Sequence, residues 1–523
     1  MGAIDQVLEA TRAAIQGSVP ATEADLSKAA PTGYMPDPGA FAGLNYINME
    51  PTARILTPIM TPLLAEIPRV DMTGKAGIQA NWRAIVDIDV NGASGQLGIG
   101  HRGEALAHRT SEFKAAFRGI GLDNFVNFEA QFASDGFVDS RALALNQLLQ
   151  MVRVKEEEAI LGGNTSLNLG TSGKCPTPTV AASTGAGTVT EGTLSVKCVA
   201  LGFRAANAYS GANQGGTNKG MTVSTFDPND YAVITKTNLD ASVDTFNGGV
   251  SQVSDAGTAT IDSGHRSATM YVTAVPGACA YAWYASVNSG THYLMAVTQI
   301  NSYSMTADPT TTTVVGANLA ANRSCSDLDF DGLLTMAFLS AGGSYIKAMA
   351  TGTPGTGTKL TSDGAGGITE FSDLFQSQWD NYRLSPETAL VSAKTLQDIS
   401  DIVVKNGGAP LVRFNTDASN PGMIQAGASV GQLWNKITNK PVKLVSHPNM
   451  PKGMVLFRTS ALGIPYPLPG IANLERMLIQ KGYYAIEWPL RSRRYEYGEY
   501  VHEVLQHFFM PALSVIYNIA PGA

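Results

Sequence analysis

The chain has 523 residues, a formal net charge of −7 and 15% charged residues, against roughly 25% in typical soluble domains. A chain with 44% hydrophobic residues is not disordered, and its mild acidity excludes a protein that holds nucleic acid by bulk positive charge. A mean hydropathy near zero with so few charges indicates that much nominal surface is buried against other subunits.

The cysteines and the hydropathy pattern narrow the class further. The four cysteines form no C-x-x-C pair and have no His doublet nearby, which excludes the usual zinc patterns and a disulfide-dense scaffold. The N-terminus lacks the basic start and apolar run of a signal peptide, and no uninterrupted apolar stretch is long enough to span a bilayer. We therefore expect no metal, no cofactor and no membrane, and a reducing, cytosol-like compartment.

Residues 1–73 are predicted to form an N-terminal arm. Ile4, Val7 and Leu8 belong to a short amphipathic helix, and a Pro/Gly-rich run follows through residues 31–39. Such a segment makes too few contacts of its own to become ordered. We therefore expect the arm to need a partner surface.

Residues 74–124 are predicted to form a long two-stranded hairpin. From Ile78 to Val90 every second residue is apolar, which is the period of a half-buried strand, and Phe113 and Phe117 repeat that alternation after a glycine-rich tip. An isolated hairpin is marginally stable in water, so its apolar face must lie on something else, and a neighbouring subunit is the expected support. The residues expected to make such self-assembly contacts here are Trp82, His101, Arg102 and Glu104.

Residues 125–172 contain the strongest helix pattern. Asp139 is a suitable N-cap, an apolar stripe spaced by three and four residues follows, and glycines 162 and 163 give a C-cap signal. The stripe consists of Ala142, Leu145, Leu149, Val152 and Ala159. Near the negative end of this helix dipole, Glu156, Glu157 and Glu158 are locally unfavourable. The favoured interpretation is a solvated face. The alternative is pairing with Arg or Lys from another segment or subunit, and on it these three carboxylates join the expected self-assembly contacts.

The composition changes from about residue 173 to residue 310, where Thr, Ser, Gly, Ala and Val dominate and no convincing helix is present. Short strands separated by turn signals predict an all-β sandwich. Helix-bearing sequence lies on both sides of this stretch. It is therefore predicted to be a domain inserted at an exposed loop.

The rest of the chain is mixed. Helices are predicted around residues 368–375 and 396–403, with a short strand at 389–391 before the second of them. Strands are predicted at 442–445, 454–457, 483–488 and 514–519. The pattern at 500–509 fits either a helix or a strand.

Two glycine-containing motifs suggest chemistry but lack the required context. Residues 98–103 match G-x-G-x-x-G, yet strands flank them on both sides instead of the strand and helix of a dinucleotide site. Residues 427–431 match G-x-S-x-G around Ser429, with Glu475 and His502 as formal triad partners. No series of βαβ units precedes this motif to build a hydrolase sheet, so a serine hydrolase is a minor alternative.

Three further patterns receive structural interpretations. Residues 327–332 copy the first half of an EF-hand loop, but the twelfth position is Phe338 where calcium requires a bidentate Glu. His502 and His507 are five residues apart, which places them on different faces of a helix and does not support zinc. The arginines at 491, 493 and 494 are interpreted as ion-pair partners and not as a nucleic-acid patch.

Five stretches, taken in order, resemble the major capsid proteins of tailed phages, the Hong Kong 97-type family. Residues 155–164 look like the end of that family's spine helix, and residues 383–396 are similar to its "x-P-x-x-x-V-x-x-x-x-T" entry into an axial-domain helix. Residues 440–453 resemble its return strand and turn. Residues 494–501 and 511–517 resemble its C-terminal strands. The resemblance covers nearly everything outside residues 173–310.

The resemblance implies an α+β fold of Hong Kong 97 type, and the insertion departs from the family's minimal pattern. The insertion itself resembles an immunoglobulin or fibronectin type III module, with residues 281–284 on a core strand. The expected order is: N-terminal arm, 1–73; extended hairpin or E-loop, 74–124; peripheral domain with spine helix, 125–172; inserted sandwich, 173–310; axial domain, 311–440; peripheral-domain strands, 441–506; and a final axial strand, 507–523.

The function that the resemblance implies is a major capsid protein, without enzymatic activity, that self-assembles into an icosahedral or prolate shell around double-stranded DNA. The implied partners are copies of the chain in hexamers and pentamers, portal, scaffolding and decoration proteins, and DNA through weak non-specific contact. The implied location is the virion capsid, with assembly in the host bacterial cytoplasm. The main alternative is an encapsulin-like shell protein of a bacterial nanocompartment.

Overall fold

The computed structural model describes residues 59–72, 77–88, 95–105, 108–134, 139–211, 220–288, 290–309, 313–406, 412–414, 424–426, 430–461, 473–490 and 492–522. Most of the predicted N-terminal arm lies outside these residues. Over the described ranges the chain is an α+β protein, as the sequence predicted. Among these residues, none of the helices combines the length and the apolar character needed to cross a bilayer.

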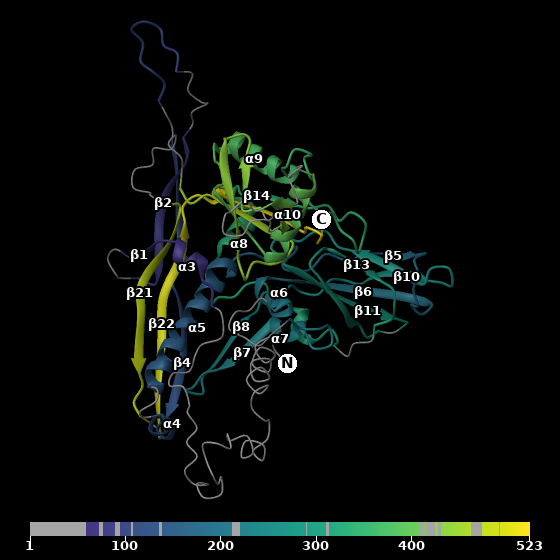
Figure 1. Cartoon of the computed structure of the whole chain (residues 1–523), viewed down its shortest axis with the longest axis horizontal. Coiled ribbons are helices and arrows are strands. Elements are labelled where there is room, and N and C mark those ends of the chain that lie inside the picture. The colour runs from purple at the N-terminus through teal and green to yellow at the C-terminus, as the bar shows by residue number, and fades with distance from the viewer. Residues whose placement is uncertain are drawn as a thin grey trace, which may run out of the picture.

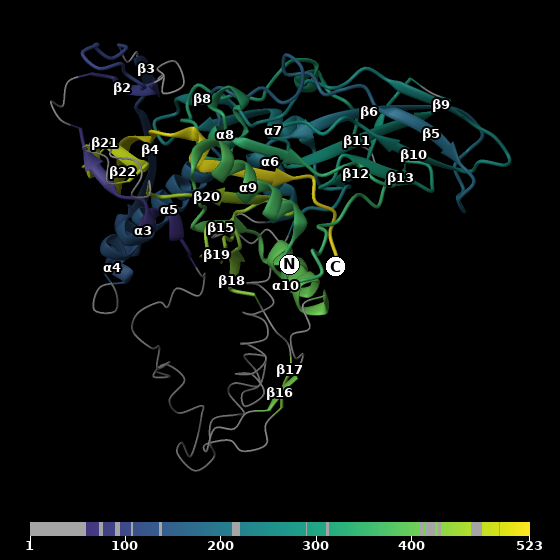
Figure 2. The ribbon, with the colours of Figure 1, turned by 90° about the horizontal axis from the view of Figure 1, so that it is seen from above.

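A twisted four-stranded sheet with the order β1-β21-β22-β4 forms one side of the molecule (Figures 1 and 2). The central strands β21 and β22 are antiparallel, β4 is antiparallel to β22, and β1 is parallel to β21. The undecided pattern at residues 500–509 is mostly strand, because it continues β22. The strands are β1 (Arg69–Asp71), β4 (Arg118–Asn127), β21 (Glu475–Glu487) and β22 (Arg494–His507).

The predicted hairpin consists of β2 (Gln79–Ile88) and β3 (His108–Ala116), paired in antiparallel register with Trp82 opposite Phe113. Only Phe117 separates β3 from β4, so hairpin and sheet form one ribbon. Figure 1 shows this ribbon projecting beyond the body of the molecule. Its prediction from alternating residues is confirmed.

Helix α5 (Ser140–Gly162) lies along one face of the four-stranded sheet (Figure 1). The Asp139 carboxylate accepts hydrogen bonds from the backbone N–H groups of Arg141 and Ala142, at 3.0 and 3.2 Å, and so caps the helix as predicted. The predicted stripe is partly wrong, because Leu145 is exposed while Leu148 packs with Val126 and Tyr497 of the sheet. Two short helices flank this sheet: α3 (Pro62–Glu66) and α4 (Phe128–Ala133).

The inserted region holds two antiparallel sheets, with strand orders β12-β11-β6-β9 and β13-β10-β5, that share one core. Figure 2 shows it extending away from the four-stranded sheet. The expectation of no helix here is wrong: α6 spans Phe203–Ser210, and the left-handed Gly211 is its C-cap. The elements are β5 (Thr179–Ser183), β6 (Gly192–Leu201), α6 (Phe203–Ser210), α7 (Pro228–Ala232), β7 (Val233–Thr237), β8 (Val243–Asn247), β9 (Gly257–Ile261), β10 (Ser267–Tyr271), β11 (Ala280–Val287), β12 (Tyr293–Thr298) and β13 (Ser302–Met305).

A six-stranded sheet, ordered β14-β23-β20-β15-β19-β18, forms the third part. The sequence assigned residues 441–506 together to the peripheral strands, but β19 and β20 pair inside this sheet, and the chain joins the four-stranded sheet only at β21. The reason is that β20 is buried along its whole length between β15 and β23. The strands are β14 (Tyr345–Ala348), β15 (Thr388–Val391), β18 (Gln432–Asn435), β19 (Lys440–Ser446), β20 (Val455–Arg458) and β23 (Leu513–Tyr517).

Helices α9 (Thr369–Tyr382) and α10 (Ala393–Asn406) pack into the core of the six-stranded sheet, where Phe371 and Phe457 meet edge to face. Helix α8 (Leu333–Phe338) lies between this sheet and the end of α5. A separate two-stranded ribbon is formed by β16 (Val412–Phe414) and β17 (Ile424–Ala426), and the 3-10 turns are η2 (Ala317–Ala320), η3 (Ser340–Gly342) and η4 (Met510–Ala512).

Candidate functional site

The base of the hairpin is anchored in the body of the chain. Ala80 and Phe117 are buried in the same core as Leu63 of α3, and Trp82 is half-buried against that core. The indole of Trp82 stacks on the ring of Phe113, with centroids 6.0 Å apart. This anchoring fixes the direction in which the ribbon leaves the molecule.

Some apolar side chains of the hairpin face solvent, from Ile78 at its base to the tip. Ile78 is 85% exposed and Phe113 is 37% exposed, and at the tip Leu97 and Ile99 are exposed as well. On the opposite face Arg83 forms an ion pair with Glu112 at 2.7 Å. At its base the ribbon therefore packs on the body, while Phe113 and the tip residues Leu97 and Ile99 leave apolar surface exposed.

The three predicted contacts at the tip are exposed: His101, Arg102 and Glu104 lie on the surface of the loop between the two strands. The G-x-G-x-x-G motif is part of this same loop between the two strands of the hairpin, as predicted. That His101, Arg102 and Glu104 make contacts between subunits stays a prediction.

A second apolar surface lies at the other end of the four-stranded sheet, and the sequence did not indicate it. It consists of the exposed side chains Phe125, Phe132, Trp488 and Leu490, which we call the distal patch. The guanidinium of Arg494 lies over the Phe125 ring, 5.0 Å from its centroid. Exposed aromatic side chains beside arginine are typical of protein interfaces.

The carboxylates at the end of α5 were predicted to form a solvated face, and this prediction is wrong. Glu156 and Glu157 are fully buried, so they are neither a solvated face nor available to another subunit. Glu158 forms an ion pair with Lys155, at 2.9 Å, on the same helix. The alternative interpretation, pairing with Arg or Lys of another segment or subunit, is confirmed for Glu156, which pairs with Arg69 of another segment. It is wrong for Glu157, whose partners are His447 and backbone N–H groups, and for Glu158, whose lysine partner is on the same helix.

Glu157 joins three parts of the fold. Its carboxylate accepts hydrogen bonds from the backbone N–H groups of Leu63 and Leu64, at 2.8 and 2.9 Å, and its Oε1 lies 2.8 Å from Nε2 of the buried His447. It therefore satisfies two N–H groups that the start of α3 leaves without helical partners. Sequence spacing could not reveal this, because His447 is 290 residues away.

The polar side chains of the EF-hand-like motif at residues 327–332 form hydrogen bonds and ion pairs with other parts of the chain. Asp331 accepts hydrogen bonds from Thr165 N, Thr165 Oγ1 and Ser166 Oγ, at 2.7, 2.9 and 2.7 Å, and Asp329 forms an ion pair with Arg204 at 3.0 Å. Among the described residues, no three His, Cys, Asp or Glu side chains are grouped so that they could hold a metal ion.

The formal triad partners of Ser429 have other contacts. His502 Nε2 lies 2.9 Å from the Tyr484 hydroxyl, and Glu475 forms an ion pair with Arg458 at 3.3 Å. Ser429 itself lies outside the described residues.

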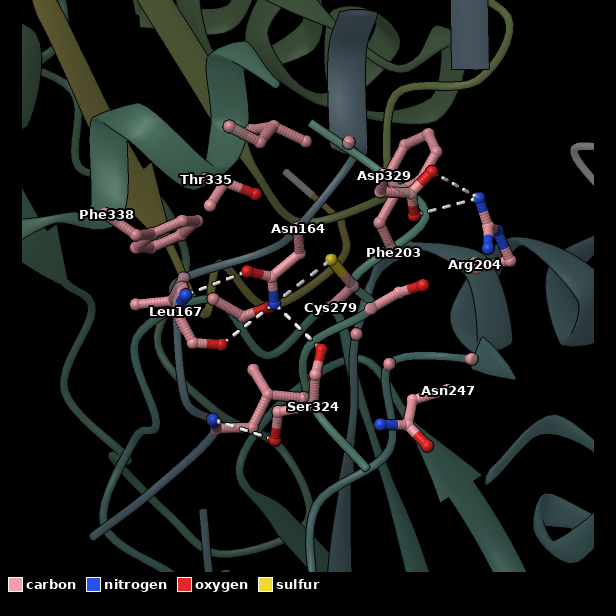
Figure 3. A pocket seen from close by; sticks show the side chains of 18 residues that line it. Asn164, Leu167, Phe203, Arg204, Asn247, Cys279, Ser324, Asp329, Thr335 and Phe338 are labelled. Atoms are coloured by element: carbon pink, nitrogen blue, oxygen red, sulfur yellow. Dashed lines mark hydrogen bonds and ion pairs between the residues drawn. The ribbon is translucent and has the colours of Figure 1, made fainter. Parts of the chain in front are cut away.

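A small cavity lies where the end of α5, the inserted region and α8 meet (Figure 3). Its volume is about 40 Å³, enough for a few water molecules and far below that of a typical ligand pocket. Asn164 spans it by donating from Nδ2 to the carbonyl groups of Leu167 and Ser324, at 2.8 and 2.9 Å. The cavity therefore marks a junction that is held by hydrogen bonds.

No family model matches the chain, and no curated protein matches its sequence. The chain is similar to several solved structures at low sequence identity. The capsid of the empty GTA particle is 8% identical, with 92% of this chain and 98% of that chain covered and a TM-score of 0.40. Mycobacterium phage Bobi is 7% identical, with coverage of 92% and 98% and a TM-score of 0.39. The holo-SrpI encapsulin complex from Synechococcus elongatus PCC 7942 is 9% identical, with coverage of 92% and 95% and a TM-score of 0.37.

Proposed function

We propose that this chain is a major capsid protein of Hong Kong 97 type, which self-assembles into a closed shell around the double-stranded DNA of a tailed phage. The observation that carries the proposal is the single ribbon formed by the hairpin and the four-stranded sheet. It carries exposed apolar side chains at both ends, at the hairpin and at the distal patch.

The exposed apolar side chains of this ribbon need a surface that covers them. A two-stranded hairpin is marginal in water unless its apolar face is covered, and each Å² of apolar surface removed from water contributes about 25 cal/mol. Copies of the chain can supply that cover at both ends of the ribbon. Many weak contacts repeated by symmetry then produce a stable assembly.

The finer parts of the proposal follow from the same assembly. The copies form hexamers and pentamers, and portal, scaffolding and decoration proteins complete the particle in the host bacterial cytoplasm. The net charge of −7 suits a container that packs DNA without adhering tightly to it. We expect the chain to have no enzymatic activity.

The test is assembly of the full chain with Trp82→Asp, with Asn81→Asp as the matched control. Asn81 is exposed on the opposite face of the same strand, so both variants add one charge to the hairpin but only Trp82→Asp places it against the stacked Phe113. We expect closed particles from the wild type and from Asn81→Asp in negative-stain microscopy. Trp82→Asp should give folded, soluble protein without closed particles.

Closed particles from Trp82→Asp at the wild-type yield would contradict the proposal. The contents of wild-type particles separate the two shell functions. Nuclease-protected DNA in particles from infected cells supports a phage capsid, whereas enclosed protein cargo supports an encapsulin-like nanocompartment.

A further inference from the structure

Four elements bring charged and polar side chains together beneath α5. Arg69 comes from β1, Glu156 from α5, Tyr483 from β21 and Glu503 from β22. The side chains of Glu156 and Glu503 are fully buried. The cluster therefore lies where the strand that leads toward the hairpin meets the helix and the centre of the sheet.

One guanidinium serves both carboxylates. Arg69 Nη2 lies 2.7 Å from Glu156 Oε1 and 2.7 Å from Glu503 Oε2, and Arg69 Nη1 donates to the Tyr483 hydroxyl at 2.8 Å. The Tyr483 hydroxyl in turn donates to Glu156 Oε2. Both terminal nitrogens of the guanidinium and the Tyr483 hydroxyl thus donate within the cluster.

The charges do not balance if both carboxylates are ionised. Two buried negative charges would face one positive charge, and an uncompensated buried charge is strongly destabilising. Glu503 Oε1 has no hydrogen-bond partner among the described residues, although it is buried. A proton on one carboxyl group would remove the excess charge and supply the missing donor.

The surrounding groups do not replace that proton. Arg153, on α5, is exposed, and its guanidinium carbon lies over the Tyr483 ring, 5.7 Å from the ring centroid. Arg153 interacts with Glu499 of β22. Burial raises the pKa of Glu499, and the charge of Arg153 offsets part of that rise. Glu157, the next residue of α5, is engaged by His447.

We propose that Glu156 and Glu503 form a buried proton-binding site, and that the single proton they share, together with Arg69, fastens β1 to α5 and β22. The proton resides on Glu503, because Glu156 already accepts a hydrogen bond from the Tyr483 hydroxyl, whereas Glu503 Oε1 has no hydrogen-bond partner among the described residues. Loss of the proton leaves two carboxylates facing each other across one guanidinium. β1 then separates more readily from the sheet, and with it the base of the hairpin.

The direction of the pH dependence follows from where the proton is held. Burial, and then the neighbouring Glu156, raise the pKa of Glu503 from 4.5 to about 9. With β1 attached to the sheet, the site holds a proton that it gives up when β1 separates. The proton therefore stabilises the attachment of β1 fully below about pH 4.5, and this stabilisation falls as the pH rises toward 9. Burial and Glu156 also raise the pKa of Tyr483, so its hydroxyl keeps its proton in this range.

The experiment measures hydrogen exchange of β1 in the full-length protein, by mass spectrometry, at pH 7 and pH 9. The reporters are the Met72 N–H, which donates to Ile479 O at 2.9 Å, and the Met477 N–H, which donates to Pro68 O at 2.9 Å. After correction for intrinsic exchange, we expect wild-type protection to fall by up to roughly tenfold per pH unit. Glu503→Gln, which is neutral and can donate at every pH, should keep its protection at pH 9.

Glu496→Gln is the matched control. It removes a carboxylate from the same strand, where Glu496 pairs with Arg494 outside the cluster, and should behave as the wild type. Equal losses of protection in Glu503→Gln and the wild type would overturn the proposal.

A second measurement needs only the wild type and does not depend on shell formation. The infrared carbonyl band of a protonated carboxyl group should be present at pH 7 and disappear as the pH passes through about 9. Absence of that band at pH 7 would also overturn the proposal, whatever the outcome of the assembly test.

Discussion

The inserted region and the hairpin are both built from β-strands, but they bury their side chains in different ways. Strand β11 is buried at every residue except its last, and Tyr281, Trp283 and Tyr284 are among the largest fully buried side chains. In the hairpin, Ile78 and Phe113 face solvent although they continue an equally regular apolar pattern. The inserted region buries one face of β11 in its own core and the other in the core that it shares with the rest of the chain, whereas the hairpin projects away from the body that anchors it.

The difference shows that an apolar pattern predicts that a strand face is buried, but does not predict whether the same chain or another one covers it. A continuous apolar strand such as β11 requires cover on both faces, and the chain provides it: Tyr281 and Trp283 pack in one core, and Ala282 and Tyr284 pack in a second core on the other face. The alternating strand β2 requires cover on one face only. We propose that copies of the same chain provide this cover.

The largest effect is expected from Trp283→Ala in the inserted region. The fully buried indole donates from Nε1 to Thr298 Oγ1 at 2.8 Å, and removal of a buried Trp costs roughly 3–5 kcal/mol. Denaturant unfolding followed by hydrogen exchange of β11 and β12 measures this loss. Trp434→Ala is the control, because its side chain is 57% exposed and the expected cost is below about 1 kcal/mol. Similar costs for the two variants would contradict a self-contained core in the inserted region.

A smaller effect is expected from Phe113→Ala in the hairpin. The substitution removes the stacking on Trp82, which is worth about 0.5–1.5 kcal/mol beyond area burial. Hydrogen exchange of β2 and β3 in the unassembled protein reports the change, and Lys114→Ala on the same strand is the control. In assembled particles the same variant should lose more, because the apolar face is then covered. An equal loss in both states would show that assembly leaves this face uncovered.

The smallest effect is expected from Arg83→Ala, which removes the exposed ion pair with Glu112 on the polar face of the hairpin. Such pairs contribute about 0.2–1 kcal/mol and are screened by salt. Exchange rates of the hairpin amides should therefore change slightly at low salt and not at high salt. A large effect that persists at high salt would mean that this face is not solvated.

The features of the candidate site that depend on residues close together in the sequence could be predicted. Alternation located the hairpin, and the spacing after Asp139 located the cap of α5; that Trp82 lies opposite Phe113 is known from the structure. The buried environment of Glu156 and Glu157 was not predictable. Their partners Arg69 and His447 come from distant segments, and a run of three carboxylates ordinarily indicates a solvated face.

The sequence by itself determined the hairpin, the start and end of α5 and the presence of a strand-rich insertion, since these features depend on side-chain period, capping and turn residues within a few positions. Only the tertiary structure decided that β19 and β20 join the six-stranded sheet, that the distal patch is exposed and that two carboxylates share Arg69. Strand pairing and the burial of charge depend on contacts between segments far apart in the chain, and no local pattern specifies such contacts.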